Sequence, residues 1–309
     1  MRKKYELSSI FVPSGNDFLD FVAMTDWVSS QWKHGTSGAD AFDPVSFNAD
    51  NLLERARTGG QFWCHPTAMT LIQIAAALGY QGRLVSLTDT GYQSDDMHAV
   101  AEFWSNHYQK WVVLDPDFNI WYSKNGIPLS TLEIHEAVMD KKTSSLIINK
   151  GLNRSDKDFE NRIPNLYKYY RYFYIDLRND WLSNAYFPGH PKRSDSATVF
   201  WQDERNPPVL NLFNKTDKKN DLYWDLNKTF MTFSAQKVAS IKGIVVDLHT
   251  VTPNFSHYAV RLNDGSPKLL DKDEFVWQFQ PGLNSIEIKS VNSAGKNGKA
   301  SNISFFLGY

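Results

Sequence analysis

The chain has 309 residues, and because this length exceeds what one hydrophobic core usually serves, two domains are expected. Its formal net charge of −1 comes from interspersed acidic and basic residues, which argues against a nucleic-acid or membrane surface, and no apolar stretch approaches the roughly 18 residues of a membrane span. Cys64 is the one cysteine, which excludes an internal disulfide and a zinc site built from several thiolates.

The N-terminal residues carry no hydrophobic core typical of a signal peptide. If Met1 is the native start, a cytoplasmic location is expected. If a signal peptide has been removed, export is expected, and the sequence does not choose between the two.

Two amphipathic helices are predicted before the cysteine. Residues 17–32 place apolar side chains at roughly helical spacing, with Asn16 as the expected N-cap. Residues 48–58 form the second helix and lead into Gly59–Gly60, a pair that brings the chain into a tight turn.

Cys64 lies at the start of a third predicted helix. Pro66 suits the first helical turn, and Gly79 supplies the C-terminal cap. Free backbone N–H groups and the positive end of the helix dipole favour a thiolate at such a position. The alternative is an inert, buried cysteine, and the residues that follow decide between the two.

Two strands are predicted downstream, over residues 97–104 and 110–115, joined by a polar turn at 105–109. If Trp104 pairs with Gln109, His98 lies directly opposite Asp115 on the same face. Side chains opposite one another on antiparallel strands have Cβ atoms within about 5.5 Å, whereas a slip of one residue would separate the faces.

A thiol at a helix start, followed by histidine and aspartate on neighbouring strands, is the arrangement used by cysteine acyl-transfer enzymes. The stretch from Gly59 to Tyr122 resembles the transglutaminase-like core of transglutaminases, peptide N-glycanases and many bacterial thiol hydrolases. The matching segments are Cys64 before a helix, Leu78–Val85 after it, His98-Ala99 with Glu102 downstream, and Trp111–Pro116. The resemblance implies a papain-like fold in which Cys64 is the nucleophile, His98 the general base and acid, and Asp115 the residue that orients His98.

The residues beside Cys64 depart from the family pattern. Tissue-type transglutaminases carry Gln directly before the cysteine and Trp just after it, whereas here Trp63 precedes Cys64 and His65 follows it. An oxyanion hole needs the Cys64 backbone N–H and one further donor. The Gln61 amide and the Trp63 indole N–H are both candidates, so thiol-dependent acyl chemistry is predicted more firmly than protein crosslinking.

Other polar residues near Cys64, His98 and Asp115 are expected to have structural rather than catalytic roles. Glu102 is expected to pair with Arg83 or to lie on the strand surface. Asp95-Asp96 is expected in a solvated loop. The alternatives are that it shapes the pocket mouth or contacts a cationic substrate. His65, His98, Asp96 and Asp115 lack the spacing of a metal site, so no metal ion and no other cofactor are expected.

The middle of the chain is predicted to be mixed. Residues 131–139 form a helix with a capping box from Ser130 and Glu133, and residues 141–165 form a solvated excursion. Two aromatic-rich stretches follow, a strand at 167–178 and residues 181–190. They form either a sugar- or peptide-binding rim or part of the core.

The last part of the chain has short strand-like runs at regular intervals, separated by turn residues, which is typical of a β-sandwich. The closing hairpin resembles that of immunoglobulin-like or fibronectin-like modules. The predicted runs are 228–233, 242–248, 257–262, 275–279, 285–290 and 302–307.

The sequence therefore predicts an α+β protein with a transglutaminase-like, papain-type domain at residues 1–221, built from helices on an antiparallel sheet. An immunoglobulin-like β-sandwich is expected at residues 222–309. The predicted function is thiol-dependent hydrolysis or transfer at an amide or ester carbonyl of a peptide, glycopeptide or protein glutamine, through a thioester. The alternative is a catalytically silent peptide- or glycan-binding protein with the same fold.

Overall fold

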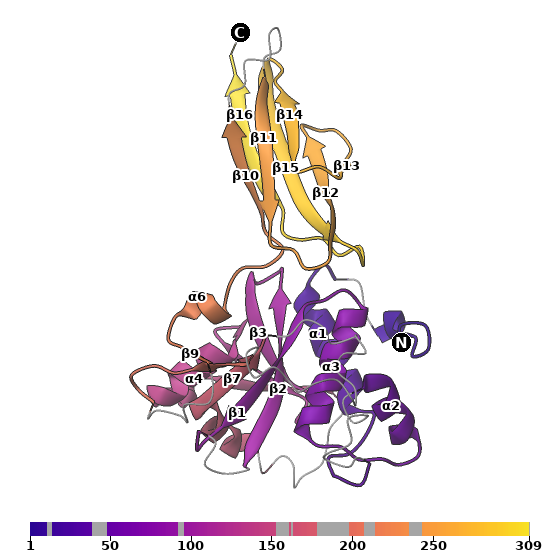
Figure 1. Cartoon of the computed structure of the whole chain (residues 1–309), viewed down its shortest axis with the longest axis vertical. Helices are drawn as coiled ribbons and strands as arrows, with labels where there is room; N and C mark the ends of the chain where they lie inside the picture. Colours follow the sequence, from indigo (N-terminus) through magenta and orange to yellow (C-terminus); the bar gives the residue numbers. More distant parts are fainter. Residues whose placement is uncertain are drawn as a thin grey trace. The chain divides into compact units, whose positions relative to one another are not determined.

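The computed structural model describes residues 1–10, 14–38, 48–91, 96–152, 161, 163–177, 198–206, 214–234 and 243–308. The chain divides into two compact units, Met1–Trp224 and Asp225–Tyr309 (Figure 1). Each unit has its own sheets and its own core.

The division falls after Trp224, whereas the sequence analysis set the boundary after residue 221. The carbonyl of Leu222 accepts a hydrogen bond from the buried Arg83 side chain. The carbonyl of Trp224 accepts one from the Trp111 indole at 3.1 Å. These contacts hold the intervening residues in the first unit.

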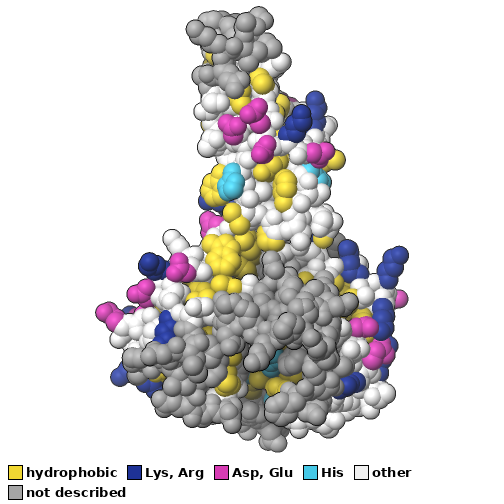
Figure 2. Space-filling model, viewed as in Figure 1, with side chains coloured by type: hydrophobic (Ala, Val, Ile, Leu, Met, Phe, Trp, Pro, Cys, Tyr) yellow, Lys and Arg dark blue, Asp and Glu magenta, His cyan; other side chains and the backbone are white. Residues whose placement is uncertain are grey.

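The surface carries charges of both signs. In the face drawn in Figure 2, acidic and basic side chains lie near one another on the described parts of the chain. Within the described ranges, no helix is both long enough and apolar enough to cross a membrane.

Within the described residues, a nine-stranded sheet forms the centre of the first unit, with the order β5-β4-β3-β2-β1-β7-β8-β9 and with β6 paired to β4. All pairs are antiparallel except β8 with β9. The strands are β1 (Gly82–Thr88), β2 (Met97–Ser105), β3 (Lys110–Asp115), β4 (Ile120–Lys124), β5 (Ile127–Pro128), β6 (Ile147–Lys150), β7 (Tyr172–Asp176), β8 (Thr198–Trp201) and β9 (Asn214–Thr216).

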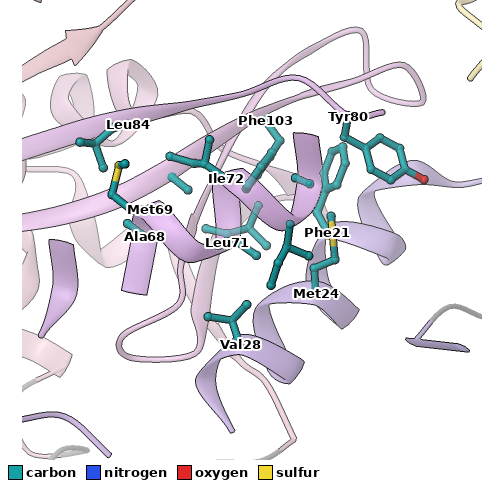
Figure 3. Close-up of a cluster of buried hydrophobic side chains, with 14 of the residues drawn as sticks. Phe21, Met24, Val28, Ala68, Met69, Leu71, Ile72, Tyr80, Leu84 and Phe103 are labelled. Atoms are coloured by element: carbon teal, nitrogen blue, oxygen red, sulfur yellow. The ribbon is translucent and has the colours of Figure 1, made fainter. Parts of the chain in front are cut away.

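Helices cover both faces of this sheet, because its central strands are apolar on both sides. On one face, α1 (Asp17–Ser29), α2 (Ala49–Arg57) and α3 (Cys64–Ala77) share a core with Leu84 and Phe103, part of which is drawn in Figure 3. On the other face, α4 (Thr131–Met139) and the 3-10 helix η4 (Ile163–Arg171) pack with strand residues such as Val85 and Val100. Shorter helical segments are η1 (Leu7–Ile10), η3 (Thr143–Ser145) and α6 (Lys219–Leu222).

The predicted helix caps are confirmed, although α1 ends at Ser29 and not at residue 32 as predicted. Asn16 and Asn48 cap α1 and α2 with their side chains, and Ser130 and Glu133 form a complete capping box on α4. Gly79 ends α3 in a left-handed conformation with φ +87°. Its N–H donates to Ala76 O at 3.0 Å, which satisfies one of the last helical carbonyls.

The predicted register of the β2–β3 hairpin is wrong. Ser105 pairs with Lys110, whereas the prediction paired Trp104 with Gln109. The loop still has four residues but lies one residue further along the chain, at 106–109, and Gln109 takes a left-handed conformation (φ 54°) as its last residue. Since side chains alternate with a period of two, this displacement leaves His98 and Asp115 on the same face, as diagonal rather than direct neighbours.

Two further predictions need correction. Residues 147–150, expected in a solvated excursion, form β6 against β4. The strand predicted at 167–178 is limited to Tyr172–Asp176, and the residues before it form η4. Residues 181–190 lie outside the described residues.

The second unit consists of two antiparallel sheets with the orders β10-β11-β14 and β13-β12-β15-β16. Val246 and Trp277 from the first sheet share a core with Tyr258, Val260 and Ile288 from the second. β13, a short edge strand, was not predicted. The strands are β10 (Thr229–Ser234), β11 (Gly243–Thr250), β12 (Phe255–Leu262), β13 (Lys268–Leu270), β14 (Glu274–Gln278), β15 (Gly282–Asn292) and β16 (Ser301–Leu307).

Candidate active site

Cys64 is the first residue of α3 and is half-buried. Among the described residues no side chain caps this helix. Its first turn is held instead by Thr67, whose N–H and hydroxyl donate to Trp63 O at 3.2 and 2.7 Å. The Trp32 indole donates to that hydroxyl at 3.1 Å. The thiol therefore lies at a rigid helix N-terminus, where the backbone dipoles favour negative charge.

His98 and Asp115 form a buried pair. His98 Nε2 lies 2.6 Å from Asp115 Oδ2, and the two residues are 6% and 1% exposed. Asp115 Oδ1 accepts hydrogen bonds from the backbone N–H groups of Asp117 and Phe118, at 3.1 and 3.0 Å. Both carboxylate oxygens of Asp115 therefore have hydrogen-bond partners. The backbone N–H groups hold the carboxylate in place, and the carboxylate holds the imidazole through Nε2.

The other side of the imidazole interacts with Cys64. Burial lowers the pKa of His98, but the negative charge and hydrogen bond of Asp115 outweigh it, and the hydrogen bond and charge of Cys64 add to them. The pKa of the imidazole is therefore well above its usual value. A protonated imidazole held between a carboxylate and a thiol can deliver its proton to a leaving group beside the thiol.

Two aromatic rings enclose the imidazole. The Phe118 ring packs edge-on at 5.4 Å between centroids, and the Tyr169 ring lies at 5.9 Å. The Tyr169 hydroxyl donates to Asp96 Oδ1 at 2.6 Å, and Lys168 Nζ lies 2.8 Å from Asp96 Oδ2. Asp96 is thus held by Lys168 and by Tyr169, whose ring lies beside His98. Asp95 lies outside the described residues.

Both predicted oxyanion donors lie on the approach to Cys64. Trp63 is the half-buried N-cap residue of α3. The Gln61 side chain packs against Gly35, where an added Cβ would lie 2.9 Å from Gln61 Cβ and 3.2 Å from its Cδ. His65 follows Cys64 in the same turn of α3 and is also half-buried.

Glu102, on the same strand as His98, pairs with Arg83 as expected, at 2.6 Å between Oε2 and Nη2. In the parts of the chain that the structure describes, no group of three or more His, Cys, Asp or Glu side chains is arranged to hold a metal ion.

One polar pair beside the triad was not predicted from the sequence. His34 Nδ1 lies 2.9 Å from Asp117 Oδ2, and His34 pairs through its backbone with Phe62. The two members of the pair are far apart in the sequence, and no local motif marks either of them. Only the tertiary fold brings them together.

Residues 11–116 match the family model of the transglutaminase-like superfamily. The chain therefore carries a transglutaminase-like superfamily domain, a fold of papain-like thiol enzymes, and the match includes Cys64, His98 and Asp115. The strand-rich remainder is consistent with an immunoglobulin-like β domain. No curated protein matches the chain.

Proposed function

We propose that this protein is a thiol-dependent hydrolase or acyltransferase that acts on an amide or ester carbonyl of a peptide, glycopeptide or protein glutamine. The observation that carries the proposal is the state of His98: its imidazole is buried, bound at Nε2 by Asp115 and in electrostatic contact with Cys64. This is the nucleophile, base and orienting carboxylate of a triad, recognised by geometry and roles.

Cys64 is the nucleophile in this proposal. Its thiolate attacks the carbonyl carbon, and the carbonyl oxygen becomes negatively charged in the tetrahedral intermediate. The Cys64 backbone N–H at the start of α3 and a donor from Gln61 or Trp63 stabilise that charge. Collapse breaks the carbonyl–nitrogen or carbonyl–oxygen bond and leaves a thioester on Cys64.

His98 carries the proton in both halves of the reaction. As an imidazolium it protonates the leaving amine or alcohol, and as a neutral base it then takes a proton from the incoming water or amine. That nucleophile attacks the thioester and releases Cys64. Water as the nucleophile gives hydrolysis, and an amine gives transfer, so the outcome depends on how far the site excludes water.

The buried pair argues against a purely binding role. An ionised His98–Asp115 pair is expensive to bury, and a silent binding protein has no need to keep it beside a thiol. We further propose that the first unit is the catalytic domain and that residues 225–309 form an immunoglobulin-like β-sandwich domain.

Alkylation of Cys64 tests the proposal without knowledge of the substrate. We expect iodoacetamide to modify Cys64 at pH 6 much faster than an ordinary thiol, because the protonated His98 stabilises the thiolate. Mass spectrometry locates the adduct, and His98→Ala is the matched control. A rate that rises only above pH 8, as for an unperturbed thiol, would overturn the proposal. Thioester adducts on Cys64 after incubation with candidate peptides and glycopeptides would then identify the substrate class.

A further inference from the structure

A short segment, residues 34–38, runs beside the residues that lead into Cys64. The Gly35 N–H donates to Phe62 O at 3.1 Å, and the Gly38 N–H donates to Gln61 O at 3.0 Å. At its far end, Gly38 O accepts a hydrogen bond from Arg55 Nη1 at 3.2 Å. The segment is therefore fixed by its backbone to the approach to the nucleophile.

The two glycines allow an approach that other residues would prevent. A Cβ at Gly35 would overlap the Gln61 side chain, and a Cβ at Gly38 would lie 2.7 Å from the Gln61 backbone nitrogen. Cβ atoms in proteins do not come this close to other heavy atoms. Residues 34–38 are therefore packed so tightly against Gln61 that a side chain at either glycine would not fit.

The first residue of the segment reaches the opposite side of the site. His34 Nδ1 donates to the Asp117 carboxylate, at 2.9 Å from Oδ2 and 3.1 Å from Oδ1. Asp117 is 2% exposed and His34 is about a third exposed, so the carboxylate is the buried member of the pair. The Asp117 N–H in turn donates to Asp115 Oδ1.

These contacts close a ring around the triad. It runs from Cys64 back along the chain to Phe62, across to His34, through Asp117 to Asp115, and through His98 to Cys64 again. We propose that His34 is a positioning residue for the reaction, an inference that rests on the proposed function of Cys64. Its pair with Asp117 fixes the separation between the nucleophile segment and the turn that holds Asp115.

The triad needs a positioning residue because its members lie on different secondary-structure elements. Cys64 comes from a helix, while His98 and Asp115 come from strands, so no single element sets the distance between them. Displacement of a reacting group by about 1 Å can cost on the order of 100-fold in rate. Catalytic groups therefore need a supporting shell that holds them.

The experiment measures the alkylation rate of Cys64 by iodoacetamide at pH 6 and pH 9, together with thermal unfolding. Three variants are compared with the unsubstituted chain: His34→Ala, His34→Asn and Lys110→Met. Asn carries an N–H donor close to the position of His Nδ1, so His34→Asn is the conservative rescue. Lys110→Met is the matched control, because it removes an ion pair with Glu133 at the other end of β3.

We expect His34→Ala to lower the rate at pH 6 by about tenfold and to leave the rate at pH 9 nearly unchanged. At pH 9 even an isolated thiol is largely ionised, so the rate no longer depends on the alignment of His98 with Cys64. His34→Asn should recover most of the rate at pH 6, and Lys110→Met should match the unsubstituted chain at both pH values.

The outcomes separate this inference from the proposed function. If the unsubstituted chain reacts quickly at pH 6 and His34→Ala reacts equally quickly, the positioning role is overturned and the proposed function stands. An equal loss at both pH values, without rescue by Asn, also overturns it, because that result indicates general loosening. If the unsubstituted chain is itself unreactive at pH 6, both proposals fail. Should His34→Ala not fold, Asp117→Leu applies the same test, because Leu is similar to Asp in size and offers no acceptor to His34.

Discussion

Two buried ion pairs lie on the same face of the central sheet, at opposite ends of β2. Arg83–Glu102 lies near the end of the strand, and His98–Asp115 near its beginning. All four side chains are at most 6% exposed. Charges buried this deeply destabilise a fold unless they are fully partnered, and the two pairs meet that requirement differently.

The Arg83–Glu102 pair is surrounded by unreactive partners. Glu102 Oε1 accepts from the Thr131 N–H at 2.6 Å and from the Tyr223 hydroxyl at 3.2 Å. Arg83 donates to the Leu222 carbonyl, and its guanidinium lies 3.9 Å from the centroid of the Trp111 ring. The partners come from β3, from the start of α4 and from the end of α6 with the residue after it, so this pair joins three parts of the first unit.

The His98–Asp115 pair differs in its third partner. Asp115 is held by backbone N–H groups, much as Glu102 is, but the imidazole interacts with the thiol of Cys64. The comparison shows that burial and charge alone do not mark a reactive site. The distinguishing feature is a partner group that can itself form and break covalent bonds.

The largest expected effect comes from removing the reactive partner or the base. Cys64→Ala and His98→Ala should each lower turnover of an identified substrate by about 10⁴-fold or more. The double variant should be scarcely worse, because triad members act as a unit. Steady-state kinetics with the substrate found by thioester trapping measures this. Intact turnover in His98→Ala would mean that the triad assignment is wrong.

These variants also separate catalysis from stability. Cys64 is half-buried, so Cys64→Ala should leave the midpoint of thermal unfolding nearly unchanged. A large loss of stability would indicate a cysteine that serves the core.

Asp115→Asn should have a smaller effect, with turnover about 100-fold higher than in His98→Ala. Asp115 Oδ1 accepts two backbone N–H groups, so the amide oxygen of Asn keeps that place and the NH₂ group faces His98. The imidazole must then accept at Nε2 and carry its proton on Nδ1, which is the wrong tautomer for a base. Parallel kinetics of the two variants measures the difference, and equal losses would contradict a purely orienting role.

Glu102→Gln should have its main effect on stability. It leaves the Arg83 charge buried without a counter-charge, which costs about 3 kcal/mol. A loss of that size lowers the unfolding midpoint by on the order of 10 °C in a unit of this size. The control is Lys110→Met, whose partly exposed pair is worth about 1 kcal/mol or less. Alkylation of Cys64 in the folded variant should stay fast, and a slow rate would mean that the two pairs are coupled.

The contrast between the pairs also shows which features the sequence reveals. Asn16, Asn48 and the capping box of Ser130 and Glu133 were predictable because a helix cap depends on residues a few positions apart. The order of thiol, histidine and aspartate was likewise visible as a motif. His98 and Asp115 lie on the same face as predicted, although the predicted register of the β2–β3 hairpin was wrong. The register differs by two residues, and an even shift keeps each side chain on its face.

Features that depend on distant residues were not predictable. Gln109 adopts a left-handed conformation that is uncommon for its residue type, which is why the turn was misjudged. Residues 147–150 became a strand because β4 offered an unpaired edge, and nothing in their own composition required it. The pair of His34 with Asp117 has no local signal for the same reason.

The smallest expected effect is a pH dependence of stability that belongs to His98 alone. The pKa of His98 is raised in the folded protein, so the imidazolium is bound more tightly there than in the unfolded chain. Its contribution to stability is fully present below the unfolded pKa of about 6.5 and is lost as the pH rises through the higher folded pKa. In a Cys64→Ala background, where no thiol titrates, the free energy of unfolding should therefore fall on the alkaline side of pH 6.5, and this fall should be smaller when His98→Asn is added. Urea unfolding at a series of pH values measures both, with His107→Asn in the same background, which replaces an exposed histidine of the β2–β3 turn, as the control. If Cys64→Ala with and without His98→Asn gave parallel curves, the buried imidazole would not be the charged partner that the comparison with Arg83–Glu102 requires.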